Sequence, residues 1–349
     1  MTIKTLHTRE DLDTLVRRLL RAHCAHPDII DDVSFAMLEA STWGVDTHGL
    51  AMLPGILRRA GDGRAQLERP AQIAHERGAA CVIDAELSPG QHATMLAARQ
   101  ANERAKQHGV GVATVRNSTH FGCCTPFLVE VARQGFVGFV GSNSLRSMAT
   151  FGLMRANLGN NPFGFAAPLE GERLMLFDAS AAKMSYGRRG QFLRAGKELP
   201  EDTFITPEHP DDDTGGVCEI ADSLEAVALP FGGFKGASVA VMVEVFSALL
   251  SAGYAGADTE VMREGVFLGP SHFVMAFAPE AFGVGDFAER MTSYYDGIRR
   301  EDDRVRLPGD RAFKIREERT AQGIPVEDSL AARINDLCRD AGVSPLAGR

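Results

Sequence analysis

Apolar residues near the start of the chain recur at intervals of three and four, which is the spacing of an amphipathic helix. The polar run from Thr8 to Asp11 precedes this pattern and is typical of a helix start. A second helix is expected from Pro27 towards Trp43, and the pattern resumes after Pro54. Residues 1 to about 74 are therefore predicted to be helical. The apolar residues that should be buried are Leu12, Leu15, Val16, Leu19, Leu20, Val33, Met37, Leu38, Ile56 and Leu57.

From about residue 75 the pattern changes to short β-rich runs separated by helical stretches. This alternation favours an α/β layer over a β-sandwich. Strands are expected at residues 80–83, 110–115, 136–140, 163–167, 175–178 and 271–277. Helices are expected at residues 91–107, 125–134, 234–253, 311–321 and 326–341, with an exposed acidic loop at 207–216.

These patterns predict an α/β fold in two parts. Residues 1–74 and 300–349 would form a helical domain built from both termini, and residues 75–299 would form an α/β domain. The sequence leaves open whether the two termini form separate lobes or close one lobe together.

Composition narrows the class of protein. The chain has 349 residues, 44% of them hydrophobic, as in an ordinary soluble globular protein. Its 37 basic and 46 acidic residues give a net charge of −9, so nucleic-acid binding, which requires a basic surface, is not expected. No apolar run reaches the roughly 20 residues of a membrane span, and residues 1–11 lack the apolar core of a signal peptide. Six cysteines in so long a chain are no disulfide scaffold, and we expect a cytoplasmic protein with reduced thiols.

Two common nucleotide-binding motifs are absent from the sequence. There is no G-x-x-x-x-G-K-[ST] segment, and no G-x-G-x-x-G segment between a strand and a helix. Gly109 and Gly111 are followed by a predicted strand rather than by a helix. A P-loop enzyme and an ordinary Rossmann dehydrogenase are therefore disfavoured.

Two histidines stand in segments that could carry chemistry. His48 lies between Thr47 and Gly49, two residues after Asp46, where it could act as a general acid or simply close a helix-to-loop junction. His120 lies in the polar segment 116–125 that follows a predicted strand, a position that commonly lines an α/β cleft.

The cysteines after His120 allow other interpretations. A zinc site formed by His120, Cys123 and Cys124 is weakly supported, because adjacent cysteines rarely bind one tetrahedral ion. A nucleophilic cysteine paired with His120 is supported equally weakly. We favour simple packing for both cysteines, and no metal is expected.

Glycine-, asparagine- and proline-rich turns occur at residues 142–144, 158–162, 232–236 and 308–311. Glycine lets a backbone approach a ligand closely, and Lys235 and Arg311 offer positive charges for a phosphate. The residues alone thus indicate a soluble α/β enzyme that binds a phosphorylated cofactor.

Taken together, the motifs resemble one family. Residues 46–49 with Leu53 are similar to its D-S-H-G-hydrophobic-x-R-L segment, residues 117–122 to its N-S-x-H-F-G, and residues 158–162 to its L-G-T-N-P. Further blocks match in the same order at residues 177–180, 232–236, 272–273 and 308–311. The family is that of the type 2 malate/L-lactate dehydrogenases. It also includes ureidoglycolate and sulfolactate dehydrogenases, 2,3-diketogulonate reductase and the piperideine-2-carboxylate reductases.

The resemblance implies an NAD- or NADP-dependent oxidoreductase with a non-Rossmann nucleotide-binding α/β domain, here residues 75–299, and a homodimer with sites near the subunit interface. His48 would be the proton donor and acceptor, Thr47 would orient it, and His120 would be catalytic or contact the cofactor. The cofactor-contacting positions that the resemblance implies are His120, Ser144, Asp178, Ala179, Ser180, Lys235, Gly309, Asp310 and Arg311.

Departures from the family pattern bear on the substrate. Met52 stands where most members have the arginine expected to bind the substrate carboxylate. Arg146 in a usually neutral segment could replace that arginine or be a surface residue, and Arg188 stands where other members have Asp or Lys. Met52, Thr125 and Arg146 are the residues we expect at the substrate.

The leading hypothesis is hydride transfer between NAD(P) and a small 2-oxo or 2-hydroxy acid or a cyclic imino acid. One alternative is a specialised biosynthetic ketone or imine reductase whose substrate lacks a simple carboxylate near Met52. Another is a non-catalytic paralogue that only binds nucleotide, against which the presence of both His48 and His120 argues. The sequence decides neither the substrate, nor between NAD and NADP, nor the direction of the reaction.

Overall fold

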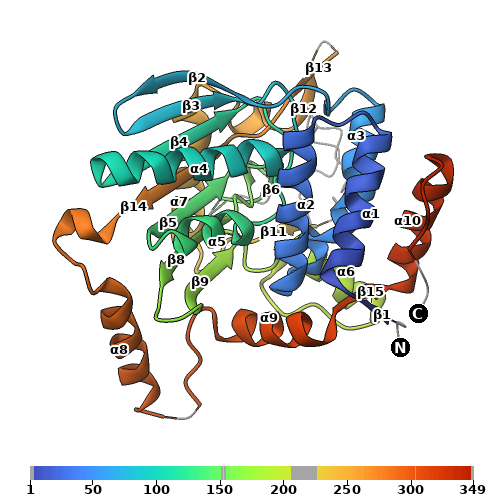
Figure 1. Cartoon of the computed structure of the whole chain (residues 1–349). Helices are drawn as coiled ribbons and strands as arrows, with labels where there is room; N and C mark the ends of the chain where they lie inside the picture. Colours follow the sequence, from blue (N-terminus) through green and yellow to red (C-terminus); the bar gives the residue numbers. More distant parts are fainter. Residues whose placement is uncertain are drawn as a thin grey trace.

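A computed structural model describes residues 4–150, 152, 155–205, 226–263, 265–302 and 304–346. At its centre is a seven-stranded sheet with the order β2-β3-β4-β14-β5-β8-β9 (Figure 1). Its strands are β2 (Gln72–Arg77), β3 (Ala80–Asp84), β4 (Val110–Arg116), β5 (Val137–Ser142), β8 (Phe163–Pro168), β9 (Leu174–Ala179) and β14 (His272–Phe277).

The direction of these strands sets the sheet apart from a doubly wound one. Among the described strands of this sheet only β3 and β4 pair in parallel, and every other neighbouring pair is antiparallel. The doubly wound dinucleotide-binding fold has a mostly parallel sheet instead.

Helices cover both faces of the sheet. Val274 joins the core beneath α4 (Gly90–His108) and α5 (Thr125–Arg133), and α2 (Pro27–Thr42) packs over these two helices. Its neighbour Phe273 points to the opposite face, where its ring lies 5.5 Å from that of Phe246. Phe246 belongs to the π-helical segment Val245–Leu249 that continues α7 (Phe234–Glu244).

Residues from both ends of the chain share a second hydrophobic cluster. It joins α1 (Arg9–Ala22), α2 and α3 (Leu53–Gly61) to β15 (Ile324–Glu327) and α10 (Asp328–Asp340). Strand β1 (Lys4–His7) pairs antiparallel with β15, so segments from the two ends of the sequence lie side by side (Figure 1). The domain boundaries expected from the sequence remain a prediction.

Smaller elements complete the chain. The 3₁₀ turns η1 (Asp46–His48) and η2 (Leu50–Met52) connect α2 to α3. The others are β6 (Arg146–Met148), β7 (Leu158–Gly159), β10 (Phe204–Ile205), β11 (Val227–Ala228), β12 (Val261–Arg263), β13 (Val266–Leu268), α6 (Tyr186–Arg194), α8 (Phe287–Arg299), α9 (Asp310–Gln322), η5 (Gly256–Asp258) and η6 (Pro279–Phe282).

Most of the predicted elements are confirmed. Thr8 caps α1 by accepting a hydrogen bond from the Asp11 amide, and the ten apolar positions predicted to be buried are buried. Two predictions are wrong: residues 1–74 include β1 and the start of β2, and Val326 and Glu327 end a strand rather than begin a helix. The predicted acidic loop at 207–216 lies outside the described residues.

Candidate active site

A cavity of about 580 Å³ lies between the segment after α2 and the loops that follow β4, β5 and β9. Its volume is in the range of small-molecule sites. The sequence-predicted residues in its wall are Thr47, His48, Met52, His120, Ser144, Asp178, Ala179 and Ser180. Fold and sequence thus bring both candidate histidines to one place.

The turn that carries His48 is fixed on α2. A Cβ atom at Gly49 would lie only 2.0 Å from the Ser41 Oγ, so glycine is required for this close approach. The Leu50 amide donates to the same oxygen at 3.1 Å. From helix α9, the Arg319 guanidinium binds both carboxylate oxygens of Asp46, two residues before the histidine.

The two histidine rings are stacked with their planes nearly parallel. Their centroids are 5.7 Å apart and their planes differ by 15°. The Thr47 Oγ1 lies 2.9 Å from the His48 Nδ1, within hydrogen-bonding distance. The Gly122 amide donates to the His120 Nδ1 at 3.0 Å, so a neutral His120 carries its proton on Nε2.

The surroundings keep both histidines neutral. Burial and, to a smaller extent, the nearby His120 lower the pKa of His48 to about 4, although Asp178 acts in the opposite direction. Burial also lowers the pKa of His120 to about 4, together with the positive charge of Arg59. Both rings are therefore uncharged at neutral pH.

Asp178 lies near the end of β9 and faces the cavity. Its Oδ2 accepts hydrogen bonds from the Thr125 amide at 2.8 Å and from the Thr125 hydroxyl at 2.6 Å. Thr125 is only 1% exposed and does not line the cavity, so the expected contact of this residue with the substrate is not what the structure shows. Instead, Thr125 holds Asp178 at the N-terminus of α5.

Ser144 is held by two asparagines. Its hydroxyl donates to the Asn160 Oδ1 at 2.8 Å, and its amide donates to the Asn161 Oδ1 at 3.0 Å. The Asn161 side chain in turn donates to the buried carboxylate of Glu244 on α7. This network gives Ser144 a fixed position in the cavity wall.

A third histidine, His272, packs against residues of the cavity wall. His272 is fully buried, and its Nδ1 and Nε2 each lie 2.8 Å from a serine hydroxyl, of Ser142 and Ser118 respectively. Phe121, next to His120, stacks on its ring at 4.9 Å. Burial lowers the pKa of His272 to about 3, so it is a neutral packing group.

Three other predicted residues lie outside this cavity. Arg146 in β6 and the exposed Arg188 in α6, whose guanidinium lies 5.9 Å from the Phe192 ring, are not among the described lining residues. Lys235 is exposed in the first turn of α7 and is also absent from the lining. The turn before Lys235 is close to the site, however, because the Phe231 amide donates to the carbonyl of Ala181, next to Ser180.

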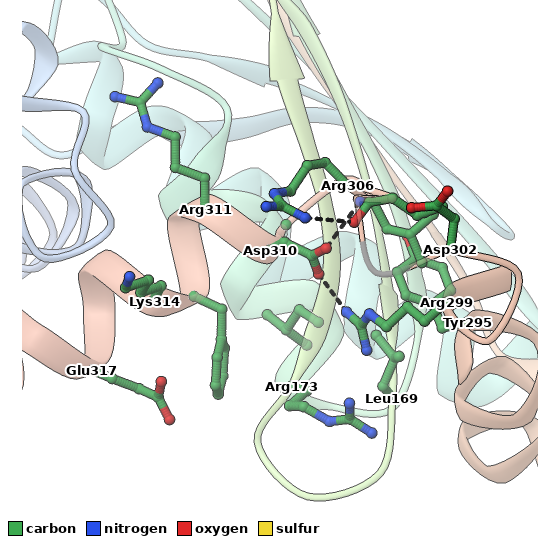
Figure 2. Close-up of a pocket in the computed structure, with 15 residues that line it drawn as sticks. Leu169, Arg173, Tyr295, Arg299, Asp302, Arg306, Asp310, Arg311, Lys314 and Glu317 are labelled. Carbon is green, nitrogen blue, oxygen red and sulfur yellow. Dashed lines mark hydrogen bonds and ion pairs between the residues drawn. The ribbon is translucent and has the colours of Figure 1, made fainter. Parts of the chain in front are cut away.

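Gly309, Asp310 and Arg311 line a second cavity of about 1100 Å³. Figure 2 shows the Asp310 carboxylate against Arg299, while Arg311 extends away from this pair. The second Asp310 oxygen accepts from the Leu307 amide, so this carboxylate already has structural partners. The two cavities share no described residue, although β9 reaches both, with Leu174 at one and Asp178 at the other.

The cysteines after His120 are packing residues. Burial and the nearby Asp178 raise the pKa of Cys123 and Cys124 well above the usual value, which disfavours the reactive thiolate. Among the described residues, no group of three or more His, Cys, Asp or Glu side chains could hold a metal ion. Within the same ranges, no helix is both long and apolar enough to cross a membrane.

Four arginines are among the lining residues that the sequence did not predict as part of the site. Arg58, Arg59, Arg64 and Arg333 all contribute to the wall. Arg58 and Arg59 lie on α3, and Arg59 follows Met52 by seven residues. That spacing, two helical turns, is the signal that could have pointed to Arg59.

Comparison with known proteins shows that the chain is related to oxidoreductases. Residues 7–335 match the family described as malate/L-lactate dehydrogenase, and the chain belongs to this family. Malate dehydrogenase of Pyrococcus abyssi is 27% identical over 97% of this chain and 95% of its own length. The (2R)-3-sulfolactate dehydrogenase (NADP(+)) of Chromohalobacter salexigens is 30% identical over 81% of this chain and 84% of its own. The resemblance inferred from the motifs is thus confirmed.

The fold is also found in solved structures. The crystal structure of malate dehydrogenase from Entamoeba histolytica aligns with a TM-score of 0.90, at 22% sequence identity. The alignment covers 98% of this chain and 99% of that one. At this identity the likeness shows the shared mixed α/β fold.

Proposed function

We propose that the protein transfers a hydride between NAD or NADP and a small 2-oxo or 2-hydroxy acid or a cyclic imino acid. The observation that carries the proposal is the stacked pair His48 and His120 in one cavity with Ser144, Asp178 and Ser180. These are positions to which the family resemblance assigns proton transfer and cofactor contact. Family membership supports the oxidoreductase class independently.

The polar groups of the cavity fit a nicotinamide nucleotide. Hydroxyls of Ser144 and Ser180 and the Asn160 amide line it, and such groups match ribose hydroxyls and a carboxamide. We propose that these residues, with Asp178 and Ala179, hold the nicotinamide half of the cofactor. Lys235 and the Gly309–Arg311 turn lie outside this cavity, and their proposed contact with the phosphates rests on the family resemblance alone. Bound there, NAD(P) would supply the hydride chemistry.

His48 would carry the proton. In the oxidation direction its Nε2 accepts the proton of the substrate hydroxyl, and in reduction the Nε2–H returns it to the carbonyl oxygen or imine nitrogen. For this, Nδ1 must keep its own proton and donate it to the Thr47 Oγ1, and the 2.9 Å separation supports that role. The family serine is replaced here by threonine, which retains the hydroxyl.

His120 would have a different task. Because its Nδ1 accepts from the Gly122 amide, its Nε2–H is a fixed hydrogen-bond donor in the cavity. A donor of this kind suits a carbonyl oxygen of substrate or cofactor and stabilises the negative charge that develops there. The pair thus divides into one proton carrier and one constant donor.

The proposal is tested by following oxidation of NADH and of NADPH against 2-oxo acids, cyclic imino acids and uncharged ketones. Turnover of one acid or imino acid supports it. Turnover of uncharged ketones alone would favour the specialised reductase. Nucleotide binding without turnover of any compound would favour the non-catalytic paralogue.

We expect oxidation to remain efficient in mild acid. A histidine base must be neutral, and burial lowers the pKa of His48 to about 4. Its neutral fraction then changes by less than about twofold from pH 7 to pH 5, whereas the neutral fraction of a base with the ordinary pKa of about 6.5 would fall roughly 25-fold. The measurement is kcat/KM for the hydroxy acid across pH 4–8. A fall of kcat/KM with a midpoint near pH 6.5 would contradict the lowered pKa of His48.

The predicted homodimer has a candidate surface on α7 and its continuation. Large apolar side chains are exposed along this helix, including Val245, Leu249 and Leu250. An apolar helix face of this kind is typical of protein contacts. We expect Leu249→Glu to shift the particle mass to that of a monomer in light scattering, while Val266→Glu, exposed in the β13 hairpin, does not. A dimer unaffected by Leu249→Glu would exclude this face as the dimer interface.

We also propose that the protein is located in the cytoplasm.

A further inference from the structure

The 3₁₀ turn η1, which carries His48, has little support of its own. It spans only Asp46–His48, and within the described part of the chain no side-chain hydrogen bond caps it. Its backbone bonds run from the His48 amide to the Val45 carbonyl at 3.0 Å and from the Gly49 amide to the Asp46 carbonyl at 3.3 Å. A single turn of this kind is not stable in isolation. The place of His48 therefore depends on contacts from outside the turn.

The turn faces two different surroundings. Val45, Thr47 and His48 line the candidate active-site cavity, but Asp46 is not among the described lining residues. Its carboxylate lies against α9 instead, where the Arg319 guanidinium binds both oxygens, one of them at 3.0 Å. Arg319 does not belong to the described cavity wall either. Any influence of this arginine on the reaction must therefore pass through the turn.

The Arg319 guanidinium also holds the end of α2. It donates to the backbone carbonyl of Ser41, in the last turn of that helix. A cation at this end complements the negative pole of the helix dipole. The planar guanidinium can bind the carbonyl and the Asp46 carboxylate together, a geometry that a lysine ammonium does not reproduce. Arg319 thus ties the end of α2 to the residue two positions before His48.

Neighbouring contacts hold α9 against the same segment. The Arg316 guanidinium lies over the Trp43 ring, 5.4 Å from its centroid. A Cβ atom at Gly44 would be 3.0 Å from the Ile315 side chain, and Gly44 has a φ of 87°, so glycine allows this close approach. Residues 315, 316 and 319 lie on one face of α9. Arg319 therefore projects from a helix that is already docked beside the turn.

We propose that Arg319 positions His48 for proton transfer by holding Asp46 and the end of α2 together. The inference rests on the proposed function, in which His48 carries the proton. Two contacts of the imidazole depend on this hold: the 2.9 Å approach of the Thr47 Oγ1 to Nδ1, and the stack on the His120 ring. Together they set the direction in which Nε2 faces the substrate. Arg319 is then a positioning residue that touches neither substrate nor cofactor.

The state of the His48 ring tests this without turnover. Nitrogen NMR of the free protein gives the tautomer and the pKa of the ring, whose signals are assigned by their loss in His48→Gln. In the wild type we expect the Nδ1–H tautomer and a pKa of about 4. In Arg319→Ala and Asp46→Asn the tautomers should mix, and the pKa should rise towards the ordinary value of about 6.5 as water reaches the ring. His120 and Asp178, which also act on this pKa, are retained in both variants.

Kinetics provides a second test. We expect Arg319→Ala to lower kcat about 10- to 100-fold, because displacement of a catalytic group by about 1 Å has an effect of this size. The affinity for NADH or NADPH should change by less than about threefold, since the change affects orientation and not binding. Arg319→Lys should be intermediate. Asp46→Asn/Arg319→Ala should be no slower than Arg319→Ala, because both changes remove the same pair.

Arg316→Ala is the matched control on the same helix. It removes an arginine that lies over Trp43 and pairs with the exposed Glu172, and that lines neither cavity. It should leave kcat and the His48 signals unchanged. Melting temperatures verify that each variant is folded. If Arg319→Ala does not fold, Asp46→Asn, which keeps the size of the side chain, provides the same two measurements.

Three results would overturn the inference. An unchanged His48 ring in variants with lowered kcat, or an equal loss of kcat in Arg316→Ala, would show that Arg319 only stabilises the fold around α9. Weakened nucleotide binding at unchanged kcat would assign Arg319 to the cofactor. Failure of the proposed function is a separate result: the wild type would turn over no acid or imino acid with either nucleotide, while the NMR measurement still shows whether Arg319 holds His48.

Discussion

Replacement of His48 by alanine is expected to lower kcat by about 10²- to 10⁴-fold, the usual contribution of a general acid or base. The proton of the substrate hydroxyl would then have no acceptor at the stacked pair, because the His120 Nδ1 is occupied by the Gly122 amide. Nucleotide affinity should change little, since the cofactor is assigned to Ser144, Asp178 and Ser180. The measurements are steady-state kinetics and titration of NADH and NADPH fluorescence.

A suitable control is His75→Ala, which removes an exposed histidine of β2 outside both cavities. It should leave kcat unchanged. Activity of folded His48→Ala within a few-fold of the wild type would remove His48 from proton transfer. An equally large loss of nucleotide affinity would instead assign His48 to the cofactor.

The helices and inner strands could be predicted because their signals are local. The apolar spacing of α1 and the capping Thr8 lie within one helix, and the buried strands are short apolar runs. Strand β1 gave no such signal, because it pairs with β15 at the far end of the chain. All six residues of strand β2 are exposed, so the strand lacks the alternation that marks a half-buried strand.

The order of the strands in the sheet could not be predicted from local sequence patterns. Strand β14 enters between β4 and β5, although it follows them by more than a hundred residues in the sequence. Nothing in a strand's own residues states which neighbours it will have. The alternation of helices and strands indicated the α/β class but not the mostly antiparallel pairing.

The site was partly predictable because its motifs are contiguous. His48 and His120 each lie within a short contiguous motif that can be recognised in the sequence. The fold brings both segments to one cavity. Arg59 has no motif around it, although it lines the same cavity. Thr125 shows the opposite case, since a residue inside a motif can support Asp178 rather than face a substrate.

The second large effect is expected on stability, from Asp32→Ala. Asp32 on α2 is 5% exposed and binds Arg99 of α4 through both carboxylate oxygens at 2.7 Å. His92 Nδ1 lies 2.7 Å from the same carboxylate, and His92 Nε2 accepts from the Ala71 amide, so Nδ1–H donates to Asp32. Asp32 therefore links α2, which contributes to the second hydrophobic cluster, to α4, which packs on the central sheet.

Removal of this carboxylate leaves two donors without their partner. Loss of one member of a buried ion pair costs about 3–5 kcal/mol, and we expect about 3 because Arg99 retains contact with water. The melting temperature should fall by roughly 5–10 °C. Asp31→Ala, on the same helix, removes only an exposed partner of Arg17 and should cost less than about 1 kcal/mol.

The pH dependence identifies the cause of this loss. Burial alone would raise the pKa of Asp32, but the hydrogen bonds from Arg99 and His92 outweigh it and lower the pKa below the usual value. Because the folded state holds this carboxylate charged more firmly than the unfolded state, its stabilisation is complete above pH ~4 and is lost as the pH falls through the lowered pKa. The difference in melting temperature between wild type and Asp32→Ala should therefore be constant from pH 7 to pH 5 and narrow below pH ~4. A difference that stays constant in acid would show that Asp32 acts through packing rather than charge.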